Sequence, residues 1–296
     1  MGSWQSHGVR AGKFARQVLA LGLSVLGLQR RPCFLIIGAM KCGTTSLHNY
    51  LTEHPQLWGA GEKEVSFFDQ NVNYRRGFAW YHSKFPIALP INENFRLFES
   101  TPSYLYYPWV PERIRTYDRN MKLIALVRDP VSRAYSEWNM WRHRSEAGTL
   151  FDKGRWDART RVPLNRLMWR GDFPDFRQCI EREIQAISAS KALAEPHLLA
   201  RGIYFDQLER YFAHFPREQV LVLDSGALKT NRIETLDSIA RYLDVAQHAW
   251  TKQSELHLVG EYSKPMSGES KEMLREFYKP YNERLFNLLG REYKWK

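Results

Sequence analysis

Short apolar runs, separated by polar or amphipathic segments, dominate the chain from residue 33 onward. Those with the length and composition of strands cover 33–38, 95–99, 121–128 and 219–223. A helix is predicted from the end of the first run to about Leu51, before His54 and Pro55, and an amphipathic helix over about 205–213. Apolar strands that alternate with helices are typical of parallel sheets covered on both faces. The pattern therefore predicts an α/β fold with a central parallel sheet and helices on both faces.

The first apolar run stops at a glycine, Gly38, and a loop rich in small and hydroxyl residues follows it. This loop carries Lys41, Gly43, Thr44, Thr45 and Ser46. Backbone N–H groups at such a strand-to-helix turn point toward an anion, and the helix dipole adds positive potential. The loop is therefore a candidate phosphate-binding turn; a purely structural glycine turn is the alternative.

The position of the lysine separates this loop from that of nucleoside triphosphatases. Their motif, G-x-x-x-x-G-K-[ST], places lysine directly after the second glycine. Here Gly38 and Gly43 have the required spacing, but Thr44 follows Gly43 and the lysine comes earlier, at Lys41. The fold element is P-loop-like, while the phosphate group that it binds is expected to differ.

Three segments resemble the sulfotransferases that use 3′-phosphoadenosine 5′-phosphosulfate (PAPS), over roughly residues 33 to 296. The loop at Lys41 resembles the family's K-x-G-T-[TS] motif, which binds the 5′-phosphosulfate. Residues 122–136 resemble its 3′-phosphate segment, in which a strand ends in R-[DN]-P and a serine follows eight residues after the arginine. Residues 62–68 resemble the E-x-E-V-x-F-F run of the heparan-sulfate branch.

The resemblance implies a role for particular residues of this chain. Lys41 would stabilise the leaving 5′-phosphate, and Glu64 would act as the general base that takes the acceptor's proton. Glu62 is the obvious rival for the base, and His82 and His143 are weaker rivals. An ion pair of Glu64 with Lys63 or another cation at the surface is the structural alternative. The implied cofactor-binding residues are Lys41, Gly43, Thr44, Thr45, Ser46, Arg128, Ser136, Arg201, Tyr204 and Lys264. No metal is expected to take part.

The acceptor implied by the closest branch is a carbohydrate hydroxyl or, less favoured, an amine. Many heparan-sulfate members carry lysine where this chain has Ser100, which leaves a small alcohol, lipid or phenol as the alternative acceptor. The stretch 138–177 is rich in Trp and Arg, and much of it lacks a clear period. We interpret it as a long loop or lid with short helices over the acceptor, rather than as plain surface structure. The candidate substrate-binding residues are Trp156, Arg159, His82 and Ser100.

Composition limits the classes of partner but does not identify the acceptor. The 43 Lys and Arg residues against 32 Asp and Glu residues give a net charge of +11, which favours anionic partners. We expect no nucleic-acid partner; a nucleotide kinase and a polyanion-binding protein are more distant alternatives. The three cysteines, Cys33, Cys42 and Cys179, contain no C-x-x-C pair. A sparse, odd set indicates a reducing compartment, so a cytoplasmic location is expected and the Golgi is less favoured.

The first 31 residues form a separate basic and apolar segment ahead of a single domain over 32–296. An apolar run of about eleven residues, 18–28, has Arg10, Lys13 and Arg16 before it and Arg30 and Arg31 after it. It falls well short of the roughly twenty residues that span a bilayer, and no small-x-small cleavage site follows. We expect either a helix packed on the domain or an interfacial helix with peripheral membrane contact.

Overall fold

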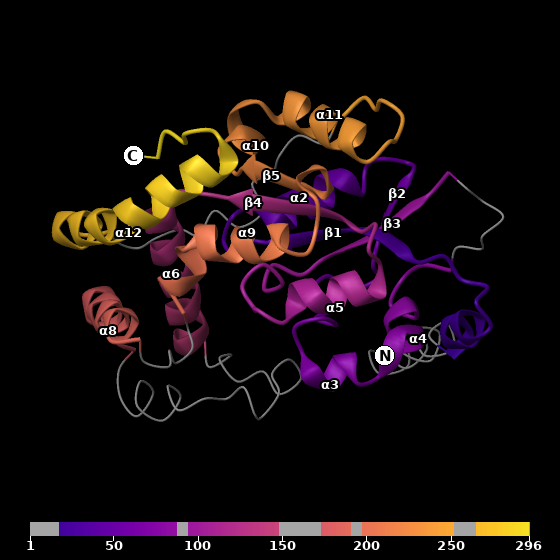
Figure 1. Ribbon diagram of the computed structural model, residues 1–296, viewed down its shortest axis with the longest axis horizontal. Coiled ribbons are helices and arrows are strands. Elements are labelled where there is room, and N and C mark those ends of the chain that lie inside the picture. Colours follow the sequence, from indigo (N-terminus) through magenta and orange to yellow (C-terminus); the bar gives the residue numbers. More distant parts are fainter. Residues whose placement is uncertain (1–17, 88–93, 148–172, 191–196, 252–264, 296) are drawn as a thin grey trace, which may run out of the picture.

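The computed structural model describes residues 18–87, 94–147, 173–190, 197–251 and 265–295 (Figure 1). A sheet of five parallel strands has the order β2-β3-β1-β4-β5. Its strands are β1 (Pro32–Gly38), β2 (Leu57–Gly59), β3 (Arg96–Ser100), β4 (Lys122–Val127) and β5 (Val220–Asp224). The parallel sheet confirms the predicted fold class.

The central strand is β1, and its position decides where the site lies. It pairs with β3 on one side and β4 on the other, so the strand order reverses beside it. Its residues Phe34–Ile37 are fully buried, as expected of a strand covered on both faces. Gly38, the last residue of β1, is paired with Ala125 of β4, so the two strands end at the same edge. In open α/β sheets, ligands bind at this kind of switch point.

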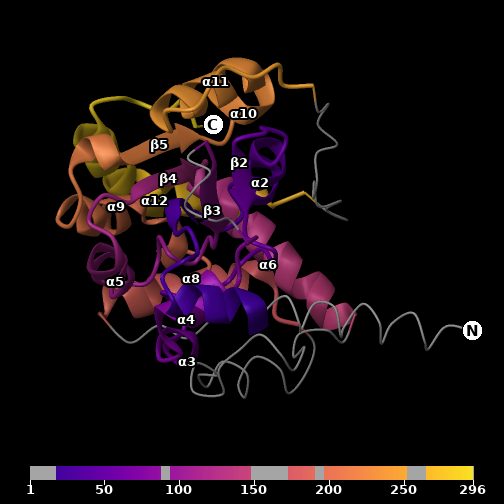
Figure 2. The ribbon, with the colours of Figure 1, turned by 90° about the vertical axis from the view of Figure 1, so that its right-hand side faces the viewer.

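Helices cover both faces of the sheet. The first half of the chain contributes α2 (Thr44–Leu51), α3 (Asn71–Tyr74), α4 (Gly77–His82), α5 (Val110–Tyr117) and α6 (Pro130–Glu146). The second half contributes α8 (Phe176–Ser188), α9 (Tyr204–Phe212), α10 (Ala227–Thr230), α11 (Arg232–Tyr242) and α12 (Gly268–Leu289), with short 3₁₀ turns η1 (Ala200–Gly202) and η2 (Arg217–Gln219). Figures 1 and 2 show α2, α10 and α11 on one face of the sheet and α5 and α9 on the other.

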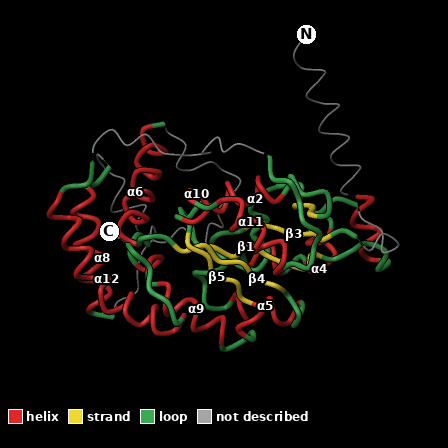
Figure 3. The backbone as a smooth tube through the Cα atoms, turned by 90° about the horizontal axis from the view of Figure 1, so that it is seen from above, coloured by secondary structure: helices red, strands yellow, loops and turns green. Residues whose placement is uncertain are grey.

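A second apolar core lies beside the sheet core and joins α6, α8 and α12, which Figure 3 shows grouped at one end of the molecule. Val131 and Ala134 of α6, Ile180 of α8 and Leu274 of α12 belong to it. The α6 helix begins as its sequence favours: Asp129 caps it by accepting from the backbone N–H groups of residues 131 and 132, and proline follows at the first turn.

The interpretation of 138–177 as a loop is wrong at both ends of that stretch. The α6 helix continues to Glu146, and α8 has already begun at Phe176. Trp138 is buried; its ring stacks on Tyr135, and its indole N–H donates to the carbonyl of Pro174 at 3.1 Å. The many Arg and Trp side chains hid the helical period there. Trp156 and Arg159 lie outside the described residues, so their predicted contact with an acceptor stays a prediction, as does the division into 1–31 and 32–296.

Candidate active site

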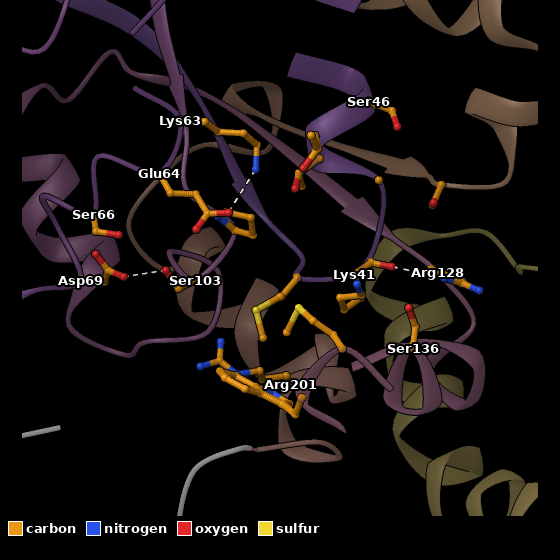
Figure 4. A pocket seen from close by; sticks show the side chains of 18 of the residues that line it. Lys41, Ser46, Lys63, Glu64, Ser66, Asp69, Ser103, Arg128, Ser136 and Arg201 are labelled. Atoms are coloured by element: carbon orange, nitrogen blue, oxygen red, sulfur yellow. Dashed lines mark hydrogen bonds and ion pairs between the residues drawn. The ribbon is translucent and has the colours of Figure 1, made fainter. Parts of the chain in front are cut away.

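A cavity of about 340 Å³ opens where β1 and β4 end, a size typical of small-molecule sites (Figure 4). Most of the residues singled out from the sequence line it: Lys41, Gly43, Thr44, Thr45, Ser46, Glu64, Arg128, Ser136 and Arg201. In Figure 4, Lys41, Arg128 and Ser136 lie on one side of the cavity, and Lys63, Glu64 and Asp69 lie on the other. The fold thus brings a basic wall to face a wall that holds two carboxylates.

The basic wall is built on the loop from β1 to α2. Gly43 is the N-cap of α2 and has φ of 87°, a left-handed conformation that favours glycine. Gly43 has no side chain with which to cap the helix, so the N–H groups of its first turn are available for an anion in the cavity. A Cβ at Gly43 would meet only Ser225 Oγ, at 3.5 Å, so the backbone conformation rather than lack of space requires glycine here.

Lys41 and Arg128 come from neighbouring strand ends and are linked through the backbone. Arg128 Nη1 donates to the carbonyl oxygen of Lys41 at 3.4 Å. Burial lowers the pKa of Lys41 and nearby arginines act in the same direction, while the charge of Glu137 opposes the shift. Because burial disfavours the charged form of Lys41, an anion bound beside the ammonium group would stabilise that form.

Tyr204 supports the basic wall from the interior of the domain. Its ring is buried, its hydroxyl donates to the carbonyl oxygen of Arg128 at 3.0 Å, and Cys42 Sγ lies 3.5 Å from the same hydroxyl. The side chain is absent from the described lining of the cavity. Tyr204 is therefore placed to hold the two loop segments together, rather than to contact a cofactor as the resemblance implied.

A buried charge cluster underlies the basic wall. Arg133 Nη1 lies 2.5 Å from Glu137 Oε2, and both side chains are completely buried in α6. Glu137 Oε1 lies 3.9 Å from Arg201 Nε and accepts from the indole of Trp141 at 3.3 Å. Because Arg201 and Trp141 line the cavity, Glu137 couples the interior of α6 to the site.

The opposite wall holds Glu64 in a left-handed backbone conformation with φ of 61°. Its backbone N–H donates to the carbonyl oxygen of Ser100 at 3.1 Å, which fixes the turn. Its carboxylate forms an ion pair with Lys63 at 3.1 Å, and 40% of the side chain is exposed. The ion pair expected as the structural alternative is therefore present, and the same carboxylate also lines the cavity.

Asp69 is a site residue that sequence reasoning missed. Its side chain is buried, Ser103 Oγ donates to Oδ2 at 2.5 Å, and Oδ1 has no hydrogen-bond partner within the described ranges. Burial raises the pKa of Asp69 to about 6, and the hydrogen bond from Ser103 opposes that shift. The aspartate follows Phe67 and Phe68 directly, so the end of the E-x-E-V-x-F-F run was the available signal.

His82 and Ser100, named as substrate-binding candidates, are not brought to the described cavity lining. His82 is buried between Ser24 and Tyr117, with its two ring nitrogens 2.8 and 2.9 Å from their hydroxyls. Ser100 is buried at the end of β3, and its hydroxyl lies 2.8 Å from His48 Nδ1. Both side chains have hydrogen-bond partners inside the domain, as buried polar side chains usually do.

The remaining candidates lie elsewhere. His143 is half-exposed on α6 and lies 3.4 Å from the carboxylate of Glu146. Glu62 is exposed and is not among the described lining residues. Lys264 lies outside the described residues. Over the ranges that the structure describes, no three His, Cys, Asp or Glu side chains are grouped to hold a metal, and no helix has the length and apolar character needed to cross a bilayer.

The profile of the "Sulfotransferase domain" family matches residues 31–278. The chain therefore belongs to the sulfotransferase family, as the motifs predicted, and is an enzyme of that class.

Curated relatives are moderately similar to this chain. It is 26% identical over 317 residues to "Membrane-associated sulfotransferase kil1" of Dictyostelium discoideum, covering 90% of this chain and 66% of that protein. It is 28% identical to human "Bifunctional heparan sulfate N-deacetylase/N-sulfotransferase 3", covering 88% of this chain and 30% of that one. It is 26% identical to human "Heparan sulfate glucosamine 3-O-sulfotransferase 5", covering 98% of this chain and 80% of that protein. The chain thus spans less than two thirds of the first two relatives.

Solved structures support the fold. A sulfotransferase from Alicyclobacillus acidocaldarius aligns with a TM-score of 0.62 and 23% identity, covering 89% of this chain and 98% of that one. A mouse sulfotransferase complexed with adenosine 3′,5′-bisphosphate (PAP) aligns with a TM-score of 0.52 and 13% identity, covering 92% of this chain and 91% of that one.

Proposed function

We propose that this sulfotransferase moves the sulfuryl group of PAPS to a hydroxyl, less favourably an amine, of a carbohydrate acceptor, and releases adenosine 3′,5′-bisphosphate (PAP). The observation that carries the proposal is the meeting of two basic segments at the switch point of the sheet. The loop at 41–46 and the pair Arg128 and Ser136 line one cavity, as a ligand with two separate phosphate groups requires.

The residues present fit such a ligand. PAPS supplies an activated sulfuryl group on its 5′-phosphate and a 3′-phosphate as a second anionic handle. The uncapped first turn of α2 offers backbone donors, and Thr44, Thr45 and Ser46 add hydroxyls. Arg128 and Ser136 are placed to bind the 3′-phosphate, since charge-assisted bonds to phosphate are the strong ones. Lys41 would stabilise the charge that develops on the leaving phosphate oxygen.

Glu64 is the proposed general base. It lines the cavity on the wall opposite Lys41, where a carboxylate can take the proton of an acceptor that lies between them (Figure 4). Its ion pair with Lys63 would have to loosen or turn when an acceptor enters. Asp69, on the same wall, is the second carboxylate within reach of that space.

The carbohydrate acceptor is supported by the heparan sulfate relatives and by the lining itself. Trp141 and Tyr107 offer flat apolar faces, and Arg144 and Lys63 offer positive charge, which together suit an acidic sugar. A small alcohol, lipid or phenol is the second candidate, because Ser100 is buried and adds no positive charge at the cavity. A cytoplasmic location is proposed from the free thiols of Cys33, Cys42 and Cys179.

Calorimetry with PAP, AMP and ATP in the absence of metal tests the cofactor. PAP should bind about tenfold or more tightly than AMP, because a charge-assisted contact contributes roughly 1.5–3 kcal/mol. Arg128→Ala should bring the affinity for PAP close to that for AMP. Equal binding of PAP and AMP by the unaltered protein would refute the 3′-phosphate assignment, and magnesium-dependent binding of ATP would favour a kinase.

Transfer of radiolabelled sulfate from PAPS to a panel of glycans, lipids and phenols tests the acceptor. Labelling of an acidic glycan is the expected result. Labelling of phenols or lipids alone would select the second candidate, and labelling of nothing while PAP binds would favour a binding protein.

A further inference from the structure

Residues 18–25 are helical and pack on the domain with small and polar side chains inward and large apolar side chains outward. This is the opposite of what is expected of a helix in water. Ala20 is only 2% exposed, and Ser24 turns its hydroxyl toward His82. The large apolar side chains point outward and are 39–71% exposed: Val18, Leu19, Leu21, Val25, Leu26 and Leu28. A surface helix of a globular protein normally buries its apolar stripe and exposes its polar one. We call these six side chains the apolar face.

The apolar face is attached to the body by specific hydrogen bonds. Ser24 Oγ lies 2.8 Å from His82 Nδ1, and Gln29 Nε2 donates to the backbone carbonyl of His82 at 2.9 Å. The other ring nitrogen of His82 lies 2.9 Å from the hydroxyl of Tyr117. The end of the helix and the residues that follow it are thus fixed to α4 and, through His82 and Tyr117, to α5. His82 is an anchor for this helix.

An exposed aromatic side chain lies on α4, the helix that carries His82. Phe78 lies one helical turn before His82, and its ring packs edge-on against Tyr117 while 39% of it remains exposed. Arg75 and Arg76, just ahead of α4, are also exposed. The element to which the N-terminal helix is anchored therefore also exposes an apolar ring beside basic residues. A group of large exposed apolar side chains, such as the apolar face, marks an interaction site.

The charge of the segment selects the partner. Residues 1–52 contain no Asp or Glu, and residues 1–31 contain Arg10, Lys13, Arg16, Arg30 and Arg31. Apolar side chains with cations before and after them in the sequence suit the interface of an anionic bilayer, where acyl chains take up the apolar groups and lipid phosphates the positive charge. A second copy of this chain would place the same positive charge opposite itself.

We propose that the apolar face, with its flanking arginines, docks the enzyme onto the surface of an anionic membrane. The helix lies in the plane of the interface, and the domain stays in water. This docking does not depend on the chemistry of the cavity, because none of the six side chains lines it.

Co-sedimentation with lipid vesicles tests the proposal. The protein should sediment with vesicles of phosphatidylcholine and phosphatidylserine (7:3) and bind at least tenfold more weakly to phosphatidylcholine alone or at high salt. Leu19→Glu combined with Val25→Glu should reduce binding to the mixed vesicles about tenfold or more. Ile233→Glu is the control for each single change: it places one glutamate at an apolar side chain of α11 that is 56% exposed, and it should leave binding unchanged. Thermal unfolding should show that the variants are folded.

Two results would overturn the proposal. One is binding of the double variant and the unaltered protein to mixed vesicles with the same affinity. The other is a dimer in light scattering that the double variant dissociates, since the apolar face would then be an interface between copies of the chain.

Discussion

Ser103 donates a hydrogen bond of 2.5 Å to the buried Asp69, and this pair forms part of the same cavity wall as Glu64. Two carboxylates therefore face the cavity from different surroundings. Glu64 is partly exposed and paired with Lys63, whereas Asp69 is buried and its pKa is raised to about 6. Carboxylates in contrasting environments are how one site separates two roles in acid–base chemistry.

Asp69→Asn should remove one limb of the pH profile. The pKa of the buried carboxyl is raised to about 6, so it is neutral below that pH and ionised above it. An ionised Asp69 can take up a proton, which the neutral carboxyl cannot. We expect kcat/KM of the unaltered enzyme to rise as the pH increases through about 6, and Asp69→Asn to lower kcat/KM and flatten this rise. A rate profile from pH 5 to 8 checks this, and an unchanged rise in the variant would contradict it.

Glu64→Gln should lower turnover by about 10²–10⁴-fold, the usual contribution of a positioned general base. Glutamine keeps the size of the side chain but cannot take a proton, so the affinity for PAP should not change. Glu62→Gln is the matched control, since Glu62 is exposed and outside the described lining. Near-normal transfer by Glu64→Gln together with a collapse in Asp69→Asn would move the base to Asp69.

The strands were predictable because each is a continuous apolar run, the signature of a strand buried on both faces. The run at 121–128 became β4 at Lys122–Val127, and the run at 33–38 became β1 at Pro32–Gly38. The edge strand β2 was missed because three residues carry no period. The outer part of α6, from residue 138 onward, was missed because only Trp138 and Asn139 are buried there, too few to give a hydrophobic period.

The site was predictable where a local motif carries it and not where the topology assembles it. Lys41 and Arg128 each end a buried strand, so their meeting at one edge followed from the parallel sheet. Ser103 and Asp69 are 34 residues apart and touch only because the loop after β3 folds back over the turn that carries Glu64. His82 shows the converse: a histidine near the motifs was interpreted as functional, while its ring is occupied by Ser24 and Tyr117.

Lys41→Ala should lower kcat by about 10²–10³-fold, the loss typical of removing one donor from a developing negative charge. The affinity for PAP should fall less, because the charge that Lys41 meets grows in the transition state. Lys229→Ala is the control, since it removes another lysine that lines the same cavity but comes from α10. Measured kcat together with calorimetry of PAP decides the point. An unchanged kcat with a raised KM would make Lys41 an anchor only.

Arg133→Met should destabilise the fold by about 3–5 kcal/mol, because it leaves the Glu137 carboxylate buried without its closest cation. Arg201, at 3.9 Å from the other carboxylate oxygen, offsets only part of that loss. The double variant Arg133→Met with Glu137→Leu should be more stable than Arg133→Met alone, since the buried Glu137 carboxylate is then no longer left without its closest cation. Urea unfolding of the two single variants and the double variant measures the coupling between the residues. Two outcomes would show that the pair does not support the basic wall. One is that the losses of unfolding free energy in the two single variants simply add in the double variant. The other is a loss below about 1 kcal/mol for Arg133→Met.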